Sequence, residues 1–133
     1  LTYGIFNDLT NLNNFYIESN LIKHLDKSVF QNLTKIDYLD FDNQKLEVIN
    51  SFSFYGLENL KVLKMSNNMI STIKTQSFYG LKKLELMTLV NNKIKIIEIN
   101  SFEGLDVLDY LDISQNLLTV IKPKDFGHLT KLQ

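Results

Sequence analysis

Closely spaced carboxylates are the residues of this chain whose types and spacing could do chemistry. Asp40 and Asp42 lie two residues apart within DYLDFDNQ, residues 37–44. In an extended strand, residues two apart project from the same side, and a calcium ion is bound by several oxygens at once. A metal site here would therefore need further oxygen ligands from the segments on either side of this stretch.

The histidines and the absence of cysteine give no evidence for catalysis or metal binding. The two histidines, His24 and His128, have no serine and aspartate at a spacing that would build a catalytic triad, and we expect both to be solvated turn residues. Cysteine is absent, so the chain has no thiolate nucleophile, disulfide or zinc–sulfur site. We therefore predict a protein that is not an enzyme and that uses no cofactor and no metal.

An unbroken repeat of 24 residues determines how the side chains are positioned. Its leucine series is Leu9, Leu33, Leu57, Leu81, Leu105 and Leu129. Its phenylalanine series is Phe6, Phe30, Phe54, Phe78, Phe102 and Phe126. A third series holds Leu1, Leu25, Ile49, Ile73, Ile97 and Ile121. A fixed period of this length indicates a solenoid, in which each repeat packs only on its neighbours.

Aligned on this period, the unit reads LxxLxxLxLxxNxLxxLxxxxFxx. Over the whole chain it resembles the leucine-rich repeat, in the 24-residue form of insect Toll-receptor ectodomains and secreted leucine-rich immune proteins. The resemblance implies a leucine-rich repeat solenoid of the α/β-type horseshoe class. About five short parallel strands would form a concave sheet, with turns, extended pieces and short 3₁₀ helices on the convex side. It also implies a stack of the phenylalanines and a ladder of Asn20, Asn68, Asn92 and Asn116, in which Gln44 keeps an amide.

The register predicts a single leucine-rich repeat domain over residues 1–133, read as an internal fragment of a longer arc. Residues 1–8 would be a partial repeat and 129–133 the start of another. The complete repeats would be 9–32, 33–56, 57–80, 81–104 and 105–128. A complete small protein with makeshift ends is the alternative.

Strand positions that are not assigned to the core form columns across the predicted concave face. An apolar centre of Val62, Leu86 and Val90 is flanked by Tyr38 and Tyr110 and bordered by aspartates. Aromatic anchors beside an apolar centre with a charged rim are typical of protein interfaces. Such residues could also merely suit a half-buried pleated surface. The predicted protein-binding residues are Tyr38, Asp40, Val62, Lys64, Leu86, Thr88, Val90, Tyr110 and Asp112.

The same columns argue against the metal site. They place Tyr16 and Lys64 on either side of Asp40, and a bound cation is disfavoured beside a lysine. We expect instead a cross-strand pair between Lys64 and Asp40. Glu18 and Asp42 would meet as like charges across neighbouring strands. This indicates either a basic partner or a fold that tolerates the repulsion between them.

Two features lie on the outer side of the repeat. Asn32-Leu33-Thr34 matches the N-glycosylation acceptor pattern, so Asn32 would be glycosylated if the protein is secreted. Phe52 occupies a turn position where other repeats carry Ser28, Gln76, Asn100 or Lys124. We expect Phe52 to pack locally beside Phe54, with a lateral contact as the alternative.

Composition limits the possible partners. The net charge of −1 and pI of about 6.1 provide no basic field for nucleic acid or an anionic membrane. No apolar run reaches the ~20 residues of a membrane helix. The resemblance implies a non-catalytic recognition module of a secreted innate-immune protein or receptor ectodomain, extracellular or at the cell surface, with a protein ligand on its concave face. Dimerisation through a lateral or concave surface fits as well. An intracellular, cytoplasmic adaptor or a binding domain attached to an enzyme are the alternatives.

Overall fold

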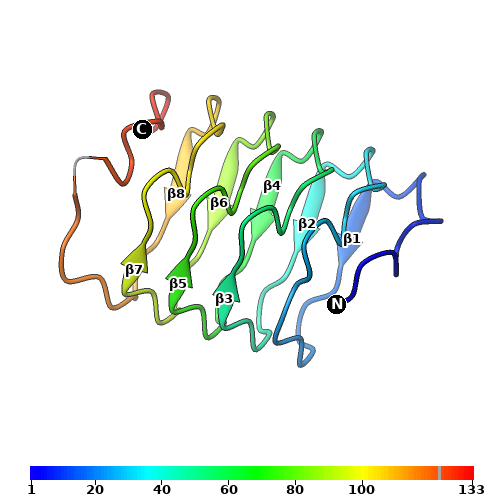
Figure 1. The fold of residues 1–133 in the computed structure, drawn as a ribbon, viewed down its shortest axis with the longest axis horizontal. Helices are drawn as coiled ribbons and strands as arrows, with labels where there is room; N and C mark the ends of the chain where they lie inside the picture. Colours follow the sequence, from blue (N-terminus) through cyan, green and yellow to red (C-terminus); the bar gives the residue numbers. More distant parts are fainter. Residues whose placement is uncertain (123) are drawn as a thin grey trace.

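The computed structural model describes residues 1–122 and 124–133 and confirms the predicted solenoid. Successive coils of the chain lie side by side, and the two termini lie at opposite ends of the stack (Figure 1). Over the described residues the chain forms eight strands and no helix, so none that could cross a membrane is found there. The return path consists of the expected turns and extended pieces, as where the Leu33 N–H donates to the Phe30 carbonyl at 2.9 Å, and the described residues form no 3₁₀ helix.

Five parallel strands form the larger sheet, in the order in which they occur along the chain. They are β1 (Asn14–Tyr16), β2 (Tyr38–Asp40), β4 (Val62–Lys64), β6 (Leu86–Thr88) and β8 (Tyr110–Asp112). Their register aligns one column of Asn14, Tyr38, Val62, Leu86 and Tyr110 and a second of Tyr16, Asp40, Lys64, Thr88 and Asp112. The predicted columns are therefore confirmed. The middle residues Leu39, Leu63 and Met87 are buried, so these columns face outward; we call this outer side of the sheet the strand face.

A second, three-stranded sheet lies on the return path of the chain and was not predicted. It consists of β3 (Val48–Ile49), β5 (Thr72–Ile73) and β7 (Ile96–Ile97), which form a separate row in Figure 1. All six residues of these strands are β-branched, and such residues favour extended backbone. The same spacing of 24 residues sets the two strand pairings of this smaller sheet, β3 with β5 and β5 with β7.

The apolar series form the core wherever a coil has a neighbour on both sides. The rings of the phenylalanine series stack along the solenoid with centroids 5.5–6.0 Å apart. The coils at the two ends depart from the prediction, because Leu9 is exposed and Ile121 is 61% exposed. Ile121 stands in the register of Ile97, but the adjacent Lys122 N–H donates to Asp125 Oδ2 at 2.8 Å rather than to the preceding coil.

The amide ladder is present and includes Gln44. Asn68 Oδ1 accepts from the Leu46 N–H at 3.0 Å, and its Nδ2 donates to the Phe41 carbonyl at 2.9 Å. Gln44 makes the same two bonds to its preceding coil, from the Ile22 N–H at 3.1 Å and to the Ile17 carbonyl at 2.6 Å. The extra methylene of Gln44 is thus absorbed without a shift in register, as predicted.

The outer turns require left-handed backbone at one position of each repeat. Phe52 lies there with φ of 60°, where Ser28, Gln76 and Asn100 have similar values. Bulky residues rarely adopt this conformation. The Phe52 ring packs edge-on against Tyr79 of the next repeat at 5.5 Å, and Lys27 Nζ lies 4.9 Å from its centroid. These contacts extend along the solenoid, away from the phenylalanine stack.

Candidate protein-binding face

The nine predicted binding residues all come from or directly follow β2, β4, β6 and β8. Strand geometry places them, because every second residue of a strand points to the same side. Met87 is 0% exposed while its neighbours Leu86 and Thr88 are half-buried, and Leu63 is flanked in the same way by Val62 and Lys64. The sequence therefore presents alternate residues to solvent without disturbing the core.

An apolar group lies at the middle of the strand face. Val62 and Leu86 are register partners on adjacent strands, and Val90 lies two residues after Thr88. All three are half-buried, so each keeps apolar surface in contact with water. Tyr38 and Tyr110 flank Val62 and Leu86 in the same column, since Tyr38 pairs with Val62 and Tyr110 pairs with Leu86.

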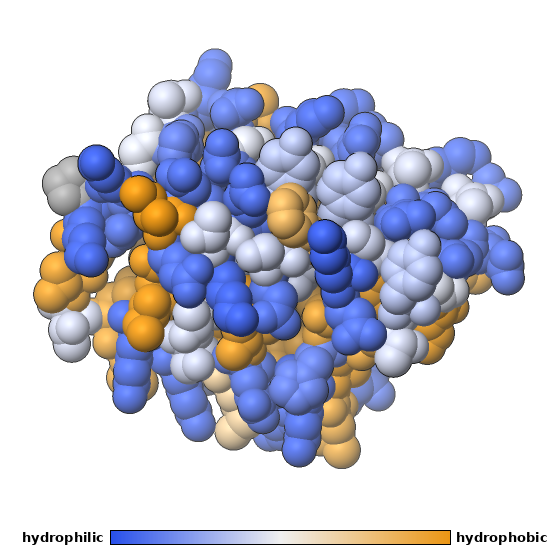
Figure 2. Space-filling model, viewed as in Figure 1, coloured by the Kyte–Doolittle hydropathy of each residue, from blue (hydrophilic) through white to orange (hydrophobic). Residues whose placement is uncertain are grey.

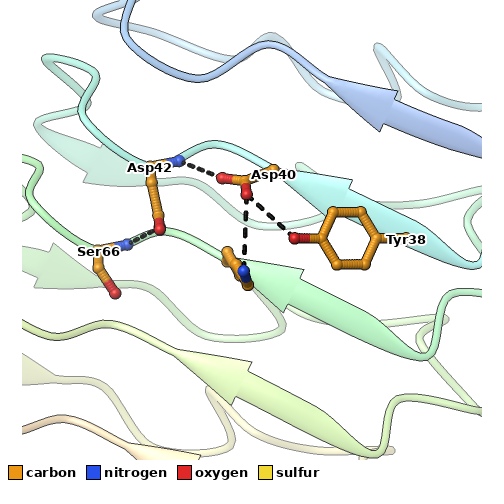
Figure 3. A network of polar contacts seen from close by, with 5 residues as sticks. Tyr38, Asp40, Asp42 and Ser66 are labelled. Carbon is orange, nitrogen blue, oxygen red and sulfur yellow. Dashed lines mark hydrogen bonds and ion pairs between the residues drawn. The ribbon is translucent and has the colours of Figure 1, made fainter.

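A polar network around Asp40 fills one side of this face (Figure 3). Asp40 Oδ2 accepts from the Tyr38 hydroxyl at 3.1 Å, and its Oδ1 accepts from the Asp42 N–H at 3.0 Å. Lys64 Nζ lies 3.9 Å from Asp40 Oδ2, which confirms the predicted cross-strand pair. Only 8% of Asp40 is exposed, so it acts mainly as the acceptor that orders its neighbours.

The network also fixes the next strand. Asp42 Oδ1 accepts from the Ser66 N–H at 2.6 Å, and the Lys64 ammonium lies 5.4 Å from the centroid of the Tyr38 ring. Burial, together with the charges of Asp40 and Glu18, raises the pKa of Asp42 above its ordinary value. Interaction with the Tyr38 hydroxyl, and then with the two aspartates, raises the pKa of Lys64 and keeps it cationic.

A second copy of the same arrangement lies at the other end of the face. Asp112 Oδ1 accepts from the Ser114 N–H at 2.9 Å, and Oδ2 lies 3.5 Å from the Tyr110 hydroxyl. Hydrogen bonds from Ser114 lower the pKa of Asp112. Sequence reasoning placed both tyrosines and both aspartates on this face but missed that each pair is bonded; the recurrence of Tyr-Leu-Asp was the available signal.

Tyr16 is a further exposed aromatic of the face that the sequence analysis did not select. It is 61% exposed, and its ring lies tilted against that of Tyr38, with centroids 5.1 Å apart. The column that contains Asp40 already placed Tyr16 on the face. Tyr16, Tyr38 and the apolar centre therefore form one continuous surface across four strands.

The remaining candidate residues lie elsewhere. Asn32 is half-buried in an outer turn, where the Thr34 carbonyl accepts from Asn59 Nδ2 at 2.6 Å. His24 and His128 are both exposed, on separate coils. Over residues 1–122 and 124–133, no three of the histidines and carboxylates come together as metal ligands would.

A second apolar region lies at the end of the three-stranded sheet. Ile96, Ile97 and Ile99 line an open groove there together with Lys122 and Lys124. Hydrophobic side chains gather at this end of the molecule, at the left in Figure 2. This groove lies at the edge of β7, on a different sheet from the strand face.

Comparison with known proteins agrees with this geometry. The family model described as leucine rich repeat matches residues 38–94 and 86–133, which together cover more than half of the chain. No curated protein matches the chain significantly.

Three solved structures illustrate the likeness. A TLR13–ssRNA13 complex is 28% identical with a TM-score of 0.71, covering 96% of this chain and 21% of that one. An internalin (InlF) from Listeria monocytogenes is also 28% identical, with a TM-score of 0.70 and coverage of 94% and 34%. The Toll–Spätzle complex of Drosophila has a TM-score of 0.85 at 22% identity, with coverage of 94% and 18%, which shows the shared fold alone. The chain thus spans about a third or less of the length of each structure.

Proposed function

The chain belongs to the leucine-rich repeat family, and on that premise we propose that its strand face is a non-catalytic protein-recognition surface. The observation that carries this proposal is the apolar centre of Val62, Leu86 and Val90 between Tyr38 and Tyr110. Tyrosine is enriched among the residues that contribute most of the binding energy in protein interfaces, and the contacts around such residues exclude water. The charged residues around them would supply the polar rim.

We assign the remaining predicted residues to this rim. Asp40 and Lys64 hold the Tyr38 ring in place through their contacts with it, so it enters binding with its rotamer already fixed. Preorganisation of this kind reduces the entropy lost on association. Thr88 and Asp112 continue the same column toward Tyr110.

We further propose an extracellular or cell-surface setting, as part of a secreted innate-immune protein or a receptor ectodomain. The 24-residue repeat and the acceptor pattern at Asn32 support this setting, and Toll, a protein of Drosophila development and innate immunity, shares the fold. A cytoplasmic adaptor is the alternative. Expression in eukaryotic cells separates them: a secreted product whose mass falls on glycosidase treatment, but not in an Asn32→Gln variant, supports the extracellular proposal.

Nucleic acid is not the partner that we propose for the strand face. TLR13 was solved with single-stranded RNA, but the face described here is rich in carboxylates, which repel phosphate. The proposed partner is a protein, and a second copy of the chain bound through the strand face or a lateral surface is one form it could take. Sedimentation of the chain with and without a Leu86→Glu substitution tests that form.

The recognition proposal is tested by selecting peptides from a random displayed library against the chain. Leu86→Glu should abolish binding of the selected peptides, because it places a charge in the apolar centre. Ile96→Glu is the matched control, since Ile96 is a 55% exposed strand residue on the other sheet. Peptides that ignore Leu86→Glu but are lost with Ile96→Glu would move the binding surface to the β7 groove.

A further inference from the structure

Charges are distributed unevenly between the strand face and the rest of the chain. The strand face and the residues that directly flank its strands carry seven of the 15 carboxylates but only two of the 14 lysines. The carboxylates are Glu18, Asp37, Asp40, Asp42, Glu85, Asp109 and Asp112, and the lysines are Lys61 and Lys64. A chain with a net charge of −1 thus concentrates a charge of −5 on one face.

We propose that the partner of the strand face is a cationic polypeptide segment, in which lysine or arginine side chains flank an apolar anchor. This inference rests on the proposed function and specifies the chemistry of the partner. The anchor would contact Val62, Leu86 and Val90, and the cations would reach the carboxylates on both sides of them. Complementary charge of this kind sets specificity and speeds association.

The carboxylates of this face are largely not neutralised by the chain itself. Among the described residues, the ion pair between Lys64 and Asp40 is the one that forms. Glu85 and Asp109 are both exposed and directly precede the adjacent strands β6 and β8, where the Asp109 N–H donates to the Glu85 carbonyl at 3.1 Å. Two like charges held side by side are unfavourable until a cation lies between them.

Two neighbouring carboxylates also lie on the other side of the face. Glu18 is exposed and Asp42 is half-buried. The two segments that contain them are neighbours, since the Ser19 N–H donates to the Asp42 carbonyl at 3.0 Å. Beside them lies the exposed ring of Tyr16, packed against Tyr38. An aromatic face next to carboxylates is a favourable position for an ammonium or guanidinium group.

Lys64 shows within the protein how such a cation would be held. Its ammonium lies over the Tyr38 ring and 3.9 Å from Asp40. Tyr110 and Asp112 form the same pair on β8, where Tyr110 is 48% exposed. A cationic side chain of the partner that lies over this ring would make the same two contacts.

The test uses the peptides selected against the chain, sorted by whether Leu86→Glu abolishes their binding. Leu86-dependent peptides should be enriched in lysine and arginine and depleted in glutamate and aspartate relative to the library. Glu18→Lys combined with Glu85→Lys should weaken their binding at least tenfold, and added salt should weaken binding to the unsubstituted chain. Asp26→Lys combined with Glu47→Lys, two exposed residues on the return side, changes the net charge equally and should have little effect.

The outcomes separate the two proposals. Leu86-dependent peptides without a cationic excess would overturn the inference about the partner and leave the recognition face intact. Equal losses in the two double variants would also overturn it, because attraction would then follow net charge rather than this face. Selected peptides that are all indifferent to Leu86→Glu would overturn the recognition face itself.

Discussion

The Tyr38 hydroxyl donates a hydrogen bond to Asp40 Oδ2 across 3.1 Å, and both residues belong to the same three-residue strand. Leu39 between them points into the core and is fully buried, so the bond runs along the outside of a strand that is fixed from within. The same relationship recurs between Tyr110 and Asp112 at 3.5 Å. Packing on one side of the sheet therefore orients polar groups on the other.

Removing the Tyr38 hydroxyl should destabilise the fold more than removing that of Tyr110. Tyr38→Phe leaves the largely buried Asp40 without one of its donors, which we expect to cost about 1–2 kcal/mol of unfolding free energy. Tyr110→Phe breaks a longer bond at Asp112, which is half-buried and so less buried than Asp40, and should cost less. Urea unfolding of both variants measures the difference, and equal shifts of the midpoint would show that the Asp40 network is not a stabilising unit.

Two buried serines should respond oppositely to loss of their hydroxyl. Ser77 Oγ lies 2.9 and 2.6 Å from the Ile49 and Lys74 carbonyls, which share its single hydroxyl proton, so Ser77→Ala should cost about 1 kcal/mol. Ser53 stands at the same repeat position and is 0% exposed, but its hydroxyl has no hydrogen-bond partner among residues 1–122 and 124–133. Ser53→Ala should therefore leave stability unchanged or raise it. Thermal unfolding that ranks Ser53→Ala below Ser77→Ala would contradict this assignment.

Asp42 and Asp112 should contribute to stability with opposite signs. The pKa of Asp42 is raised in the folded state, so its contribution is present at pH values below the unfolded pKa and is lost as pH rises through the folded pKa. Asp42→Asn should thus stabilise the protein at neutral pH, because the amide oxygen can still accept from Ser66.

The pKa of Asp112 is lowered, so its contribution is present above the unfolded pKa and is lost as pH falls through the folded pKa. Asp112→Asn should destabilise the protein at neutral pH. Both differences should disappear in acid, well below the ordinary carboxyl value of 3.8. Unfolding curves for the two variants at neutral and acidic pH check the signs, and a shared sign at neutral pH would rule out this explanation.

Neighbouring residues on β6 should behave as an inside–outside pair. Met87→Glu buries a carboxylate in the core and should cost several kcal/mol, enough to abolish cooperative unfolding. Leu86→Glu adds the same group to the solvent side and should leave the far-ultraviolet circular dichroism and the melting transition close to those of the original chain. Similar destabilisation by both substitutions would mean that β6 is not oriented as described.

The repeat made most of the fold predictable from sequence. A period of 24 without insertions fixes the strand register, so the columns of the strand face followed from spacing alone. Gln44 was predictable as well, because it retains both an amide donor and an amide acceptor. The second sheet was missed because its two-residue strands lack the alternation that marks a half-buried strand. Ile121 was assigned to the core but is exposed. The period gives the position of a residue within the repeat, but not whether a neighbouring coil packs against that residue.

The candidate site was predictable only in part. Spacing shows which residues face outward, but Asp40 is mostly buried within its own network, a fact that depends on the rotamers of Tyr38 and Lys64. Tyr16 was overlooked because its contact with Tyr38 crosses between strands and between columns. Contacts of this diagonal kind depend on side-chain direction, which a repeat pattern does not specify.

The central claim is that a ligand covers the strand face, and the absence of cysteine allows it to be tested directly. Thr88→Cys places a single thiol on the strand face, and Ser71→Cys places one beside β5 on the other sheet; both positions are half-buried. The rate of alkylation of each thiol should be measured with and without a selected peptide. We predict that the peptide slows alkylation at position 88 and leaves position 71 unchanged. Protection at 71 with free reaction at 88 would contradict the account.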